Sequence, residues 1–417
     1  MKKEDTMKGL KIDFSTGKAA LMKMHLVGKY FLTSFKRDWP IPEITYPNQI
    51  RVKTRMGGIC ASDFHMMMLD ISYFASILVS PENPSPMGHE LVGEVVEMGH
   101  EASRFTIGDR VTYMPVAACN AYGFKPCTAC QRGNMESCVS MAGVGDGSDI
   151  EKSFRAAGGF GGFSGGGFCE YLTAFENQFF KVPDSVSDRI AVLSEPFAIA
   201  IHAVSRNMPL NEQTIVVVGA GIIGLLIIVG LRLLGFTGRI ITIARYPFQE
   251  QKAKELGADL VIRESDRETL YDKVAEATGA RLFKPMVGKR GVFGNNGPDL
   301  IFDCVGTEET VDDSLHLVRS NGKIVIVGQA YAKTKKVDWA IQLFKEVTIV
   351  GASLYGSETY KGKSMHAFEL SIRLFKENSE LFSGLVTHTF ALEDYKNAFA
   401  CAVNKAKTYA IKTVFSF

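Results

Sequence analysis

The sequence predicts an α/β protein in which a doubly wound parallel sheet is combined with an irregular β domain. Three observations predict this. A chain of 417 residues with 46% hydrophobic side chains exceeds what one core needs. Residues 1–199 carry short β-type runs between glycine turns, whereas apolar strands alternate with helical stretches over 200–350. The tail, 351–417, returns to mixed character, and we expect it to dock on the first segment and make that domain discontinuous.

Composition points to a small-molecule substrate. With 47 basic and 45 acidic side chains the formal net charge is +2, so no broad field attracts nucleic acid or an anionic membrane. The charged start, Met1–Lys8, is not followed by an apolar block of signal-peptide length. We therefore expect a cytoplasmic protein.

One apolar stretch, 215–231, approaches the roughly 20 residues that a membrane-spanning helix needs. The turn Gly219-Ala220-Gly221 divides it into a β-branched run, 215–218, and an apolar helical run from Ile222. A buried parallel strand, a turn and a core-facing helix have this pattern, which we favour over a membrane span.

The same turn begins a G-x-G-x-x-G motif, Gly219-Ala220-Gly221-Ile222-Ile223-Gly224, placed between a strand and a helix. The first glycine permits the tight turn, the second lets backbone amides approach a pyrophosphate, and the third allows close packing of helix on strand. In this setting the motif predicts a dinucleotide site in a Rossmann-like domain.

The strand after the motif, 239–243, ends at Ala244-Arg245. A carboxylate that binds the ribose 2′-hydroxyl of NAD usually stands about 20 residues past the glycines, and none stands at this strand end. Arg245, with no acid to compete, could pair with a 2′-phosphate, which favours NADP(H) over NAD(H). The alternative is that Arg245 is a solvated residue at the end of a strand.

Further apolar strands are expected at 299–303, 323–327 and 347–350, and a helix at 248–256. Two segments resist assignment. Residues 141–167 are dense in glycine, and residues 280–298 mix basic side chains with glycines. Each could be a surface loop, which we favour, or a cover over the site.

Eight cysteines are present, and half of them lie within twenty residues. In a chain without an export signal, this clustering favours metal ligation over disulfides. Four thiolates supply the closed tetrahedron of a structural zinc site. The clustered cysteines are Cys119, Cys127, Cys130 and Cys138.

Three further pieces carry metal-binding residue types: 58–65 with Cys60, 88–93 with His89 and Glu90, and 193–196 with Glu195. Thiolate, imidazole and carboxylate together can hold Zn²⁺ and leave a position open for substrate. With the nucleotide motif, these pieces resemble the zinc-dependent medium-chain dehydrogenase family. The Glu-Pro pair at 195–196 is most similar to its sorbitol and polyol dehydrogenase branch. The resemblance also includes segments 108–111, 167–171, 325–328 and 385–388.

The resemblance implies a GroES-like catalytic domain and a homodimer or homotetramer. Cys60 and His89 would bind the catalytic zinc, and Glu90 or Glu195 would be the remaining ligand, one of them acting through water. Asp63 would be the partner of His89. The family separates its first two lobe cysteines by two residues, whereas seven separate Cys119 from Cys127. This insertion could bulge out of an occupied site at about 115–140, which we favour, or distort or empty the site.

The implied reaction moves a hydride between a polyol or secondary alcohol and NAD(P). Zinc would act as the Lewis acid, and Ser62, through the cofactor ribose, would pass the hydroxyl proton to His65. Two alternatives remain. A zinc-free enone or quinone reductase using NADPH would not need the zinc ligands, and a non-catalytic zinc- and nucleotide-binding regulator would not need Ser62 or His65.

Overall fold

The computed structural model describes residues 6–70, 84–119, 124–139, 166–328 and 334–417. Of the two unassigned segments, 141–167 lies outside the described residues as far as residue 165. Two compact units are present, and each is discontinuous in sequence. Unit 1 comprises Met1–Glu195, Tyr355–Ser357 and His366–Phe417; unit 2 comprises Pro196–Leu354 and Glu358–Met365.

Unit 1 contains a seven-stranded sheet of order β19-β20-β3-β5-β6-β8, in which β7 also pairs with β3, and a small sheet of order β2-β1-β4. Buried and exposed side chains alternate along β3, as expected for a strand with one face on the core: Ile50, Val52 and Thr54 are buried, whereas Lys53 and Arg55 are exposed. The strands are β1 (Thr6–Ile12), β2 (Thr33–Pro40), β3 (Gln49–Gly58), β4 (Ser85–Pro86), β5 (Glu90–Met98), β6 (Arg110–Tyr113), β7 (Tyr171–Phe175), β8 (Phe179–Lys181), β19 (Val386–Ala391) and β20 (Lys412–Ser416).

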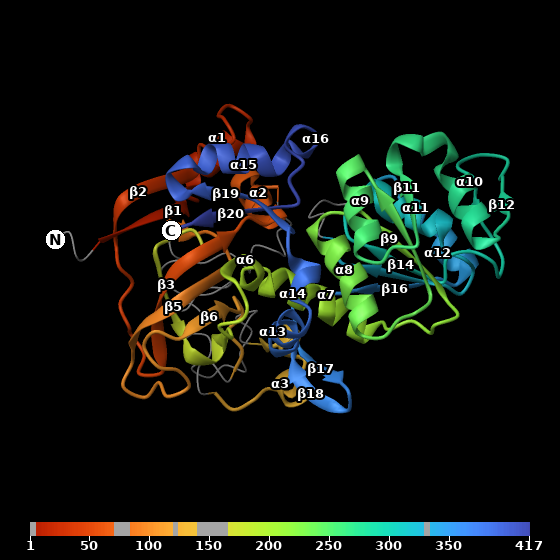
Figure 1. Ribbon diagram of the computed structural model, residues 1–417. Helices are drawn as coiled ribbons and strands as arrows, with labels where there is room; N and C mark the ends of the chain where they lie inside the picture. Colours follow the sequence, from red (N-terminus) through yellow and green to blue (C-terminus); the bar gives the residue numbers. More distant parts are fainter. Residues whose placement is uncertain (1–5, 71–83, 120–123, 140–165, 329–333) are drawn as a thin grey trace. The chain divides into compact units, whose positions relative to one another are not determined.

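Short helices surround these sheets (Figure 1). They are α1 (Thr16–Lys23), α2 (Ala61–Met68), α3 (Thr128–Gln131), α6 (Asp188–Ala191), α13 (Ala367–Glu377), α14 (Ser379–Phe382), α15 (Tyr395–Val403) and α16 (Lys405–Thr408), with single 3₁₀ turns at Met135–Ser137, Glu176–Gln178 and Leu392–Asp394. The C-terminal strand β20 pairs with β3, so the tail completes the sheet of the first segment.

Unit 2 is built on a six-stranded parallel sheet of order β11-β10-β9-β14-β15-β16. The order reverses at β9, which is the doubly wound arrangement of dinucleotide-binding domains. The expected strands are all present, and β11 is an additional strand. The strands are β9 (Thr214–Val218), β10 (Arg239–Ala244), β11 (Leu260–Arg263), β14 (Leu300–Asp303), β15 (Lys323–Ile326) and β16 (Thr348–Gly351).

Helices connect these strands (Figure 1). Because crossovers between parallel strands are right-handed, reversal at β9 places the earlier helices on one face of the sheet and the later ones on the other. The helices are α7 (Ser194–Arg206), whose first two residues belong to unit 1, α8 (Ile222–Leu233), α9 (Pro247–Glu255), α10 (Arg267–Thr278), α11 (Glu308–Leu317) and α12 (Ala340–Lys345), with a 3₁₀ turn at Glu264–Asp266.

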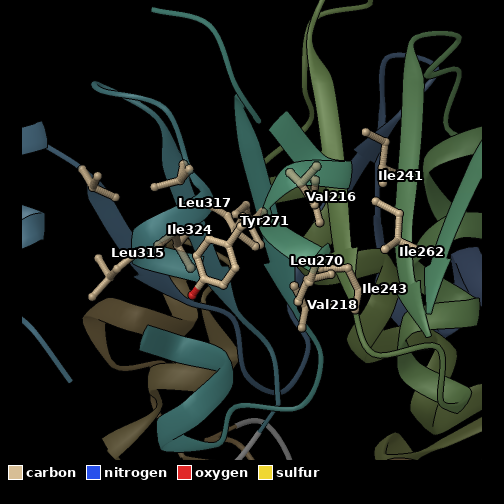
Figure 2. Close-up of a cluster of buried hydrophobic side chains, with 14 residues drawn as sticks. Val216, Val218, Ile241, Ile243, Ile262, Leu270, Tyr271, Leu315, Leu317 and Ile324 are labelled. Atoms are coloured by element: carbon tan, nitrogen blue, oxygen red, sulfur yellow. The ribbon is translucent and has the colours of Figure 1, made fainter. Parts of the chain in front are cut away.

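The core of one sheet face is shown in Figure 2. Val216, Val218, Ile241 and Ile243 point from β9 and β10 toward side chains of α10, including Leu270. Burying such aliphatic side chains contributes about 1.5–3 kcal/mol each. The apolar stretch 215–231 is thus a buried strand and a core helix, and no helix in the described part of the chain is long and apolar enough to span a membrane.

The second unassigned segment, 280–298, contains a short hairpin of β12 (Leu282–Phe283) and β13 (Gly291–Val292). Its side chains Met286 and Val287 are exposed, while Lys289 forms ion pairs with two carboxylates of α11. The segment 280–298 therefore contains regular secondary structure.

A second hairpin joins β17 (Ser357–Tyr360) to β18 (Lys363–His366).

A buried lysine closes the end of α11. Lys345 is 5% exposed, and its Nζ donates to the carbonyls of Leu315 (2.7 Å), His316 (3.1 Å) and Val318 (2.8 Å). These carbonyls end the helix and have no further intrahelical donor.

We expect Lys345→Met to lower the free energy of unfolding by about 2–4 kcal/mol, because three buried carbonyls lose their donors. Urea unfolding followed by circular dichroism measures the loss. Lys284→Met, at an exposed position of the β12–β13 hairpin, is the control and should stay within about 0.5 kcal/mol of the parent protein. Equal effects of the two substitutions would contradict this interpretation.

Candidate metal centres and nucleotide site

Strand pairing in unit 1 brings three candidate metal ligands together. Gly58, at the end of β3, pairs with Glu90, the first residue of β5, so the Cys60 that follows β3 lies beside His89 and Glu90. The Cys60 sulfur, a His89 ring nitrogen and a Glu90 carboxylate oxygen all lie within 4.8 Å of one another. Thiolate, imidazole and carboxylate at this separation suit Zn²⁺.

Asp63 lies behind this group and is fully buried. One carboxylate oxygen, Oδ2, accepts the backbone N–H of Cys60 at 2.8 Å, and the other, Oδ1, lies 4.0 Å from His89 Nδ1. Burial raises the pKa of Asp63 to about 6, against the opposing effects of His89 and the Cys60 N–H. The distance to His89 is that of an ion pair, longer than a hydrogen bond.

The electrostatic field at this site favours a cation. Burial disfavours a charge on the His89 ring, but the hydrogen bond and charge of Cys60, with the charges of Asp63 and Glu195, outweigh burial. The pKa of His89 is therefore held well above its usual range. Acidic groups that stabilise a positive imidazole would equally stabilise a metal ion.

Glu90 has a partner that the sequence interpretation missed. Lys412, on β20, forms an ion pair with Glu90 Oε2 and donates to the carbonyl of Ile59 at 2.9 Å. Both side chains are almost completely buried. Burial opposes the ammonium charge, but the charge and hydrogen bond of Glu90, with the charges of Cys60 and Glu195, outweigh burial and raise the pKa of Lys412 above its usual range. A lysine within the apolar run 411–415 was a usable signal, since a fully buried lysine needs an acidic partner.

Glu195 is buried in the first turn of α7 but is not in the three-residue group found among the described residues. Its Oε1 accepts the hydroxyl of Tyr355 at 2.7 Å, a contact for which the sequence offered no signal. Burial and repulsion by Glu90 raise the pKa of Glu195 to about 7, against the attraction of His89 and the Tyr355 hydrogen bond. Glu195 thus acts electrostatically on His89 from outside the group.

Ser62 and His65 lie on α2, three positions apart and on one face of the helix. The Ser62 hydroxyl is buried and has no hydrogen-bond partner within the described residues. A buried hydroxyl in this state suits a ligand oxygen. His65 is partly exposed, and its Nδ1 lies 3.5 Å from Asp70 Oδ2, a contact that the sequence interpretation did not include.

The four clustered cysteines also come together. Their sulfurs all lie within 4.8 Å of one another, and those of Cys119 and Cys138 are 3.5 Å apart. Burial opposes ionisation of Cys127, but N–H groups of Cys130 and Val139 with neighbouring thiols lower the pKa of Cys127 to about 6. The insertion after Cys119 therefore leaves this cysteine beside the other three. Residues 120–123 of the insertion lie outside the described residues.

In unit 2 each glycine of the nucleotide motif meets a different requirement. Gly219 has φ +91°, and a Cβ there would lie 2.4 Å from a Val305 methyl. At Gly224 a Cβ would lie 1.9 Å from the Gly219 carbonyl oxygen, whereas at Gly221, which precedes α8, it would meet nothing within 4 Å. The open space beside Gly221, at a helix N-terminus, suits a pyrophosphate, and Ile222 and Ile223 begin the helix.

The expectation that Arg245 lacks a competing acid is wrong. Arg245 donates from Nε and Nη2 to the two carboxylate oxygens of Glu264, at 2.8 and 3.0 Å. Parallel pairing of β10 with β11 sets Ala244 beside Arg263 and so brings Glu264 to Arg245. The Arg245 side chain is nevertheless 61% exposed, so a ligand can reach it.

Comparisons with known proteins agree with both units. Residues 46–184 match the family model for the alcohol dehydrogenase GroES-like domain, and residues 223–369 match that for zinc-binding dehydrogenases. An L-threonine 3-dehydrogenase of Burkholderia vietnamiensis (strain G4 / LMG 22486) is 29% identical over 92% of this chain and 96% of its own length.

Two solved structures extend the similarity. The 2R,3R-butanediol dehydrogenase from Bacillus subtilis is 26% identical, with a TM-score of 0.67 over 99% of this chain and 100% of its own. An Escherichia coli CFT073 alcohol dehydrogenase, solved with NADH, has a TM-score of 0.70 at 24% identity over 99% of this chain and 100% of its own, a likeness of fold. This chain belongs to the zinc-dependent medium-chain dehydrogenase family, whose members are oxidoreductases.

Proposed function

We propose that this protein transfers a hydride between a secondary alcohol or polyol and a nicotinamide cofactor, with zinc as the Lewis acid. The observation that carries the proposal is the convergence of Cys60, His89 and Glu90. The relatives' names, a threonine 3-dehydrogenase and a butanediol dehydrogenase, denote substrates with a secondary hydroxyl group, which supports the substrate class.

Cys60 and His89 are the proposed ligands of the catalytic metal, and Glu90 is the carboxylate grouped with them. The ion pair with Lys412 engages Glu90 Oε2, so Oε1 is the oxygen that we assign to the metal. Glu195, outside this group, would act through a water molecule. When bound, zinc supplies the positive charge that lowers the pKa of the substrate hydroxyl toward neutrality.

The proton released by the substrate needs a path to solvent. The buried Ser62 hydroxyl can accept a hydrogen bond from substrate and donate to the cofactor ribose. His65 is 31% exposed, and Asp70 beside it would orient the ring. Ser62 and His65 are thus the proposed ends of a proton relay.

The proposed cofactor site comprises the three motif glycines with Ile222, Ile223, Ala244 and Arg245. The glycine turn and the start of α8 would bind the pyrophosphate. We propose NADP(H) over NAD(H), with the exposed guanidinium of Arg245 exchanging Glu264 for the 2′-phosphate. Without a 2′-phosphate the cofactor would leave the Arg245–Glu264 pair intact.

Two substitutions test the cofactor preference in opposite directions. Arg245→Ala should weaken NADP(H) binding about 10- to 100-fold, the effect of losing charge-assisted hydrogen bonds, and change NAD(H) binding little. Glu264→Gln removes the competing carboxylate and should strengthen NADP(H) binding severalfold. Fluorescence titration of both cofactors measures the effects, and an unchanged preference in both variants would remove the assignment.

The four-cysteine lobe, Cys119 with Cys127, Cys130 and Cys138, is proposed to hold a second, structural zinc, because four thiolates form a closed tetrahedral site.

Self-association of the chain is also proposed. Strand β16 ends the sheet order, and α12 before it exposes Leu343 (70%) and Phe344 (74%), side chains that a second copy could cover. Sedimentation velocity tests whether the chain is a homodimer or homotetramer.

The decisive experiment combines metal analysis with a substrate panel. We expect two zinc ions per chain, and oxidation of polyols or secondary alcohols that is lost on chelation and restored by Zn²⁺. Full activity of metal-free enzyme toward enones or quinones would instead support the zinc-free reductase. Nucleotide and zinc binding without turnover of any alcohol would support the non-catalytic regulator.

A further inference from the structure

We propose that the segment Tyr355–Ser357 links the four-cysteine lobe to the catalytic metal centre, so that metal in the lobe fixes the position of the Glu195 carboxylate. This inference rests on the proposed function. The segment is unusual in the chain. Its three residues belong to unit 1, whereas the chain before it, through Leu354, and after it, from Glu358, belongs to unit 2.

At one end of the segment, Tyr355 is held by packing. Its side chain is 1% exposed, and its ring lies edge-on to Phe368 with centroids 4.9 Å apart. The centroid of the His366 ring lies 6.5 Å from that of Tyr355. The ring is buried against these side chains, and its hydroxyl donates to Glu195 Oε1 at 2.7 Å. Tyr355 is therefore a positioning residue for Glu195.

At the other end, Ser357 is tied to the lobe. Its backbone N–H donates to the carbonyl of Gly133 at 3.1 Å, and the N–H of Gly133 donates to the carbonyl of Cys130 at 3.1 Å. Gly133 has φ +76°, and a Cβ there would lie 3.2 Å from Ser357 Cβ. Only glycine combines this conformation with so close an approach without strain.

In its described residues the lobe is held by short-range backbone hydrogen bonds and a small buried cluster. Cys127 precedes a helix of only four residues, α3, and Cys130 lies within it. The buried part of the lobe's apolar cluster is Ala118, Cys119 and Cys138. Folding of such small sites is coupled to metal binding. Loss of the metal would release Gly133 and then Ser357, so the segment would stay attached at its Tyr355 end alone and the hydroxyl of Tyr355 would shift from Glu195.

The test uses enzyme with Co²⁺ in the catalytic site and Zn²⁺ in the lobe, because d–d absorption of Co²⁺ reports ligand geometry. Two substitutions act on opposite ends of the link. Tyr355→Phe removes the hydroxyl, and Gly133→Ala strains the turn against Ser357. The matched control is Gly384→Ala, at a glycine with φ +81° and open space around its Cβ position.

We expect Tyr355→Phe and Gly133→Ala to change the Co²⁺ spectrum in the same sense and to lower kcat about 10- to 100-fold, the effect of a small misplacement at a reacting centre. KM for the cofactor should stay constant. Gly384→Ala should match the parent enzyme in both measurements. If Gly133→Ala does not fold, Ser357→Pro deletes the donated N–H at the first residue of β17, where proline is tolerated.

A Gly133→Ala enzyme with the spectrum and kcat of Gly384→Ala would overturn the link, as would an unchanged spectrum in Tyr355→Phe. Failure of the proposed function gives a different result. The unsubstituted Co²⁺ enzyme would then lack both a spectrum of thiolate-ligated cobalt at Cys60 and turnover of any alcohol.

Discussion

Cys60→Ala is expected to abolish alcohol oxidation, by more than about a thousandfold, while nucleotide binding stays within about twofold of the unsubstituted enzyme. Cys60 supplies the thiolate of the proposed catalytic metal site, and loss of Lewis acidity there removes several kcal/mol of barrier lowering. The glycine turn that would bind the cofactor belongs to unit 2, whereas Cys60 belongs to unit 1. Steady-state rates, cofactor titration and zinc content measure the three quantities separately.

Cys401→Ala is the control for this experiment. Cys401 is buried on α15 and belongs to neither group of candidate metal ligands in the described residues. It should keep two zinc ions per chain and nearly full activity, whereas Cys60→Ala should keep one. Equal loss of turnover and nucleotide binding in Cys60→Ala would count against the separate roles assigned to the two units.

The parallel sheet of unit 2 could be predicted because its signals are local. The apolar run at 215–218, the glycine turn and the following helix are contiguous, so the strand, the turn and the phosphate-binding edge can all be inferred together. The additional strand β11 (Leu260–Arg263) was missed because it is short and ends in a charged residue. This omission also hid Glu264, which follows β11, and led to the wrong conclusion that Arg245 has no acidic partner.

The candidate catalytic centre could be predicted only in part, because its residues come from distant parts of the chain. Cys60, His89 and Glu90 carry recognisable chemistry, and their motifs resemble a known family, although nothing local shows that they meet. Lys412 is more than 300 residues from Glu90, and it reaches the site because β20 pairs with β3 and β3 with β5. Such partners are set by sheet pairing over long sequence distances, which neither periodicity nor spacing reveals.

Lys412→Met should have the largest effect on stability. In metal-free protein it leaves the buried Glu90 carboxylate without its cation, and the expected loss in free energy of unfolding is about 3–5 kcal/mol. The double substitution Lys412→Met with Glu90→Gln should cost less than Lys412→Met alone, because it removes both charges. Urea unfolding of the four proteins forms a double-mutant cycle. Additive losses would show that the ion pair contributes nothing to stability.

Zinc binding provides a second measurement on the same variants. A metal ion at Cys60 and His89 would bring positive charge next to Glu90, so it should replace part of what Lys412 supplies. A ligand that binds only the folded state stabilises it by an amount that grows with the logarithm of its affinity. Zn²⁺ should therefore raise the Tm of Lys412→Met by more than it raises that of the unsubstituted protein. When Glu90 is already Gln, adding Lys412→Met should no longer increase the rise in Tm that Zn²⁺ produces. If Zn²⁺ raised the Tm of all these proteins equally, the metal would not interact with Glu90, and the assignment of Glu90 as a metal ligand would be wrong.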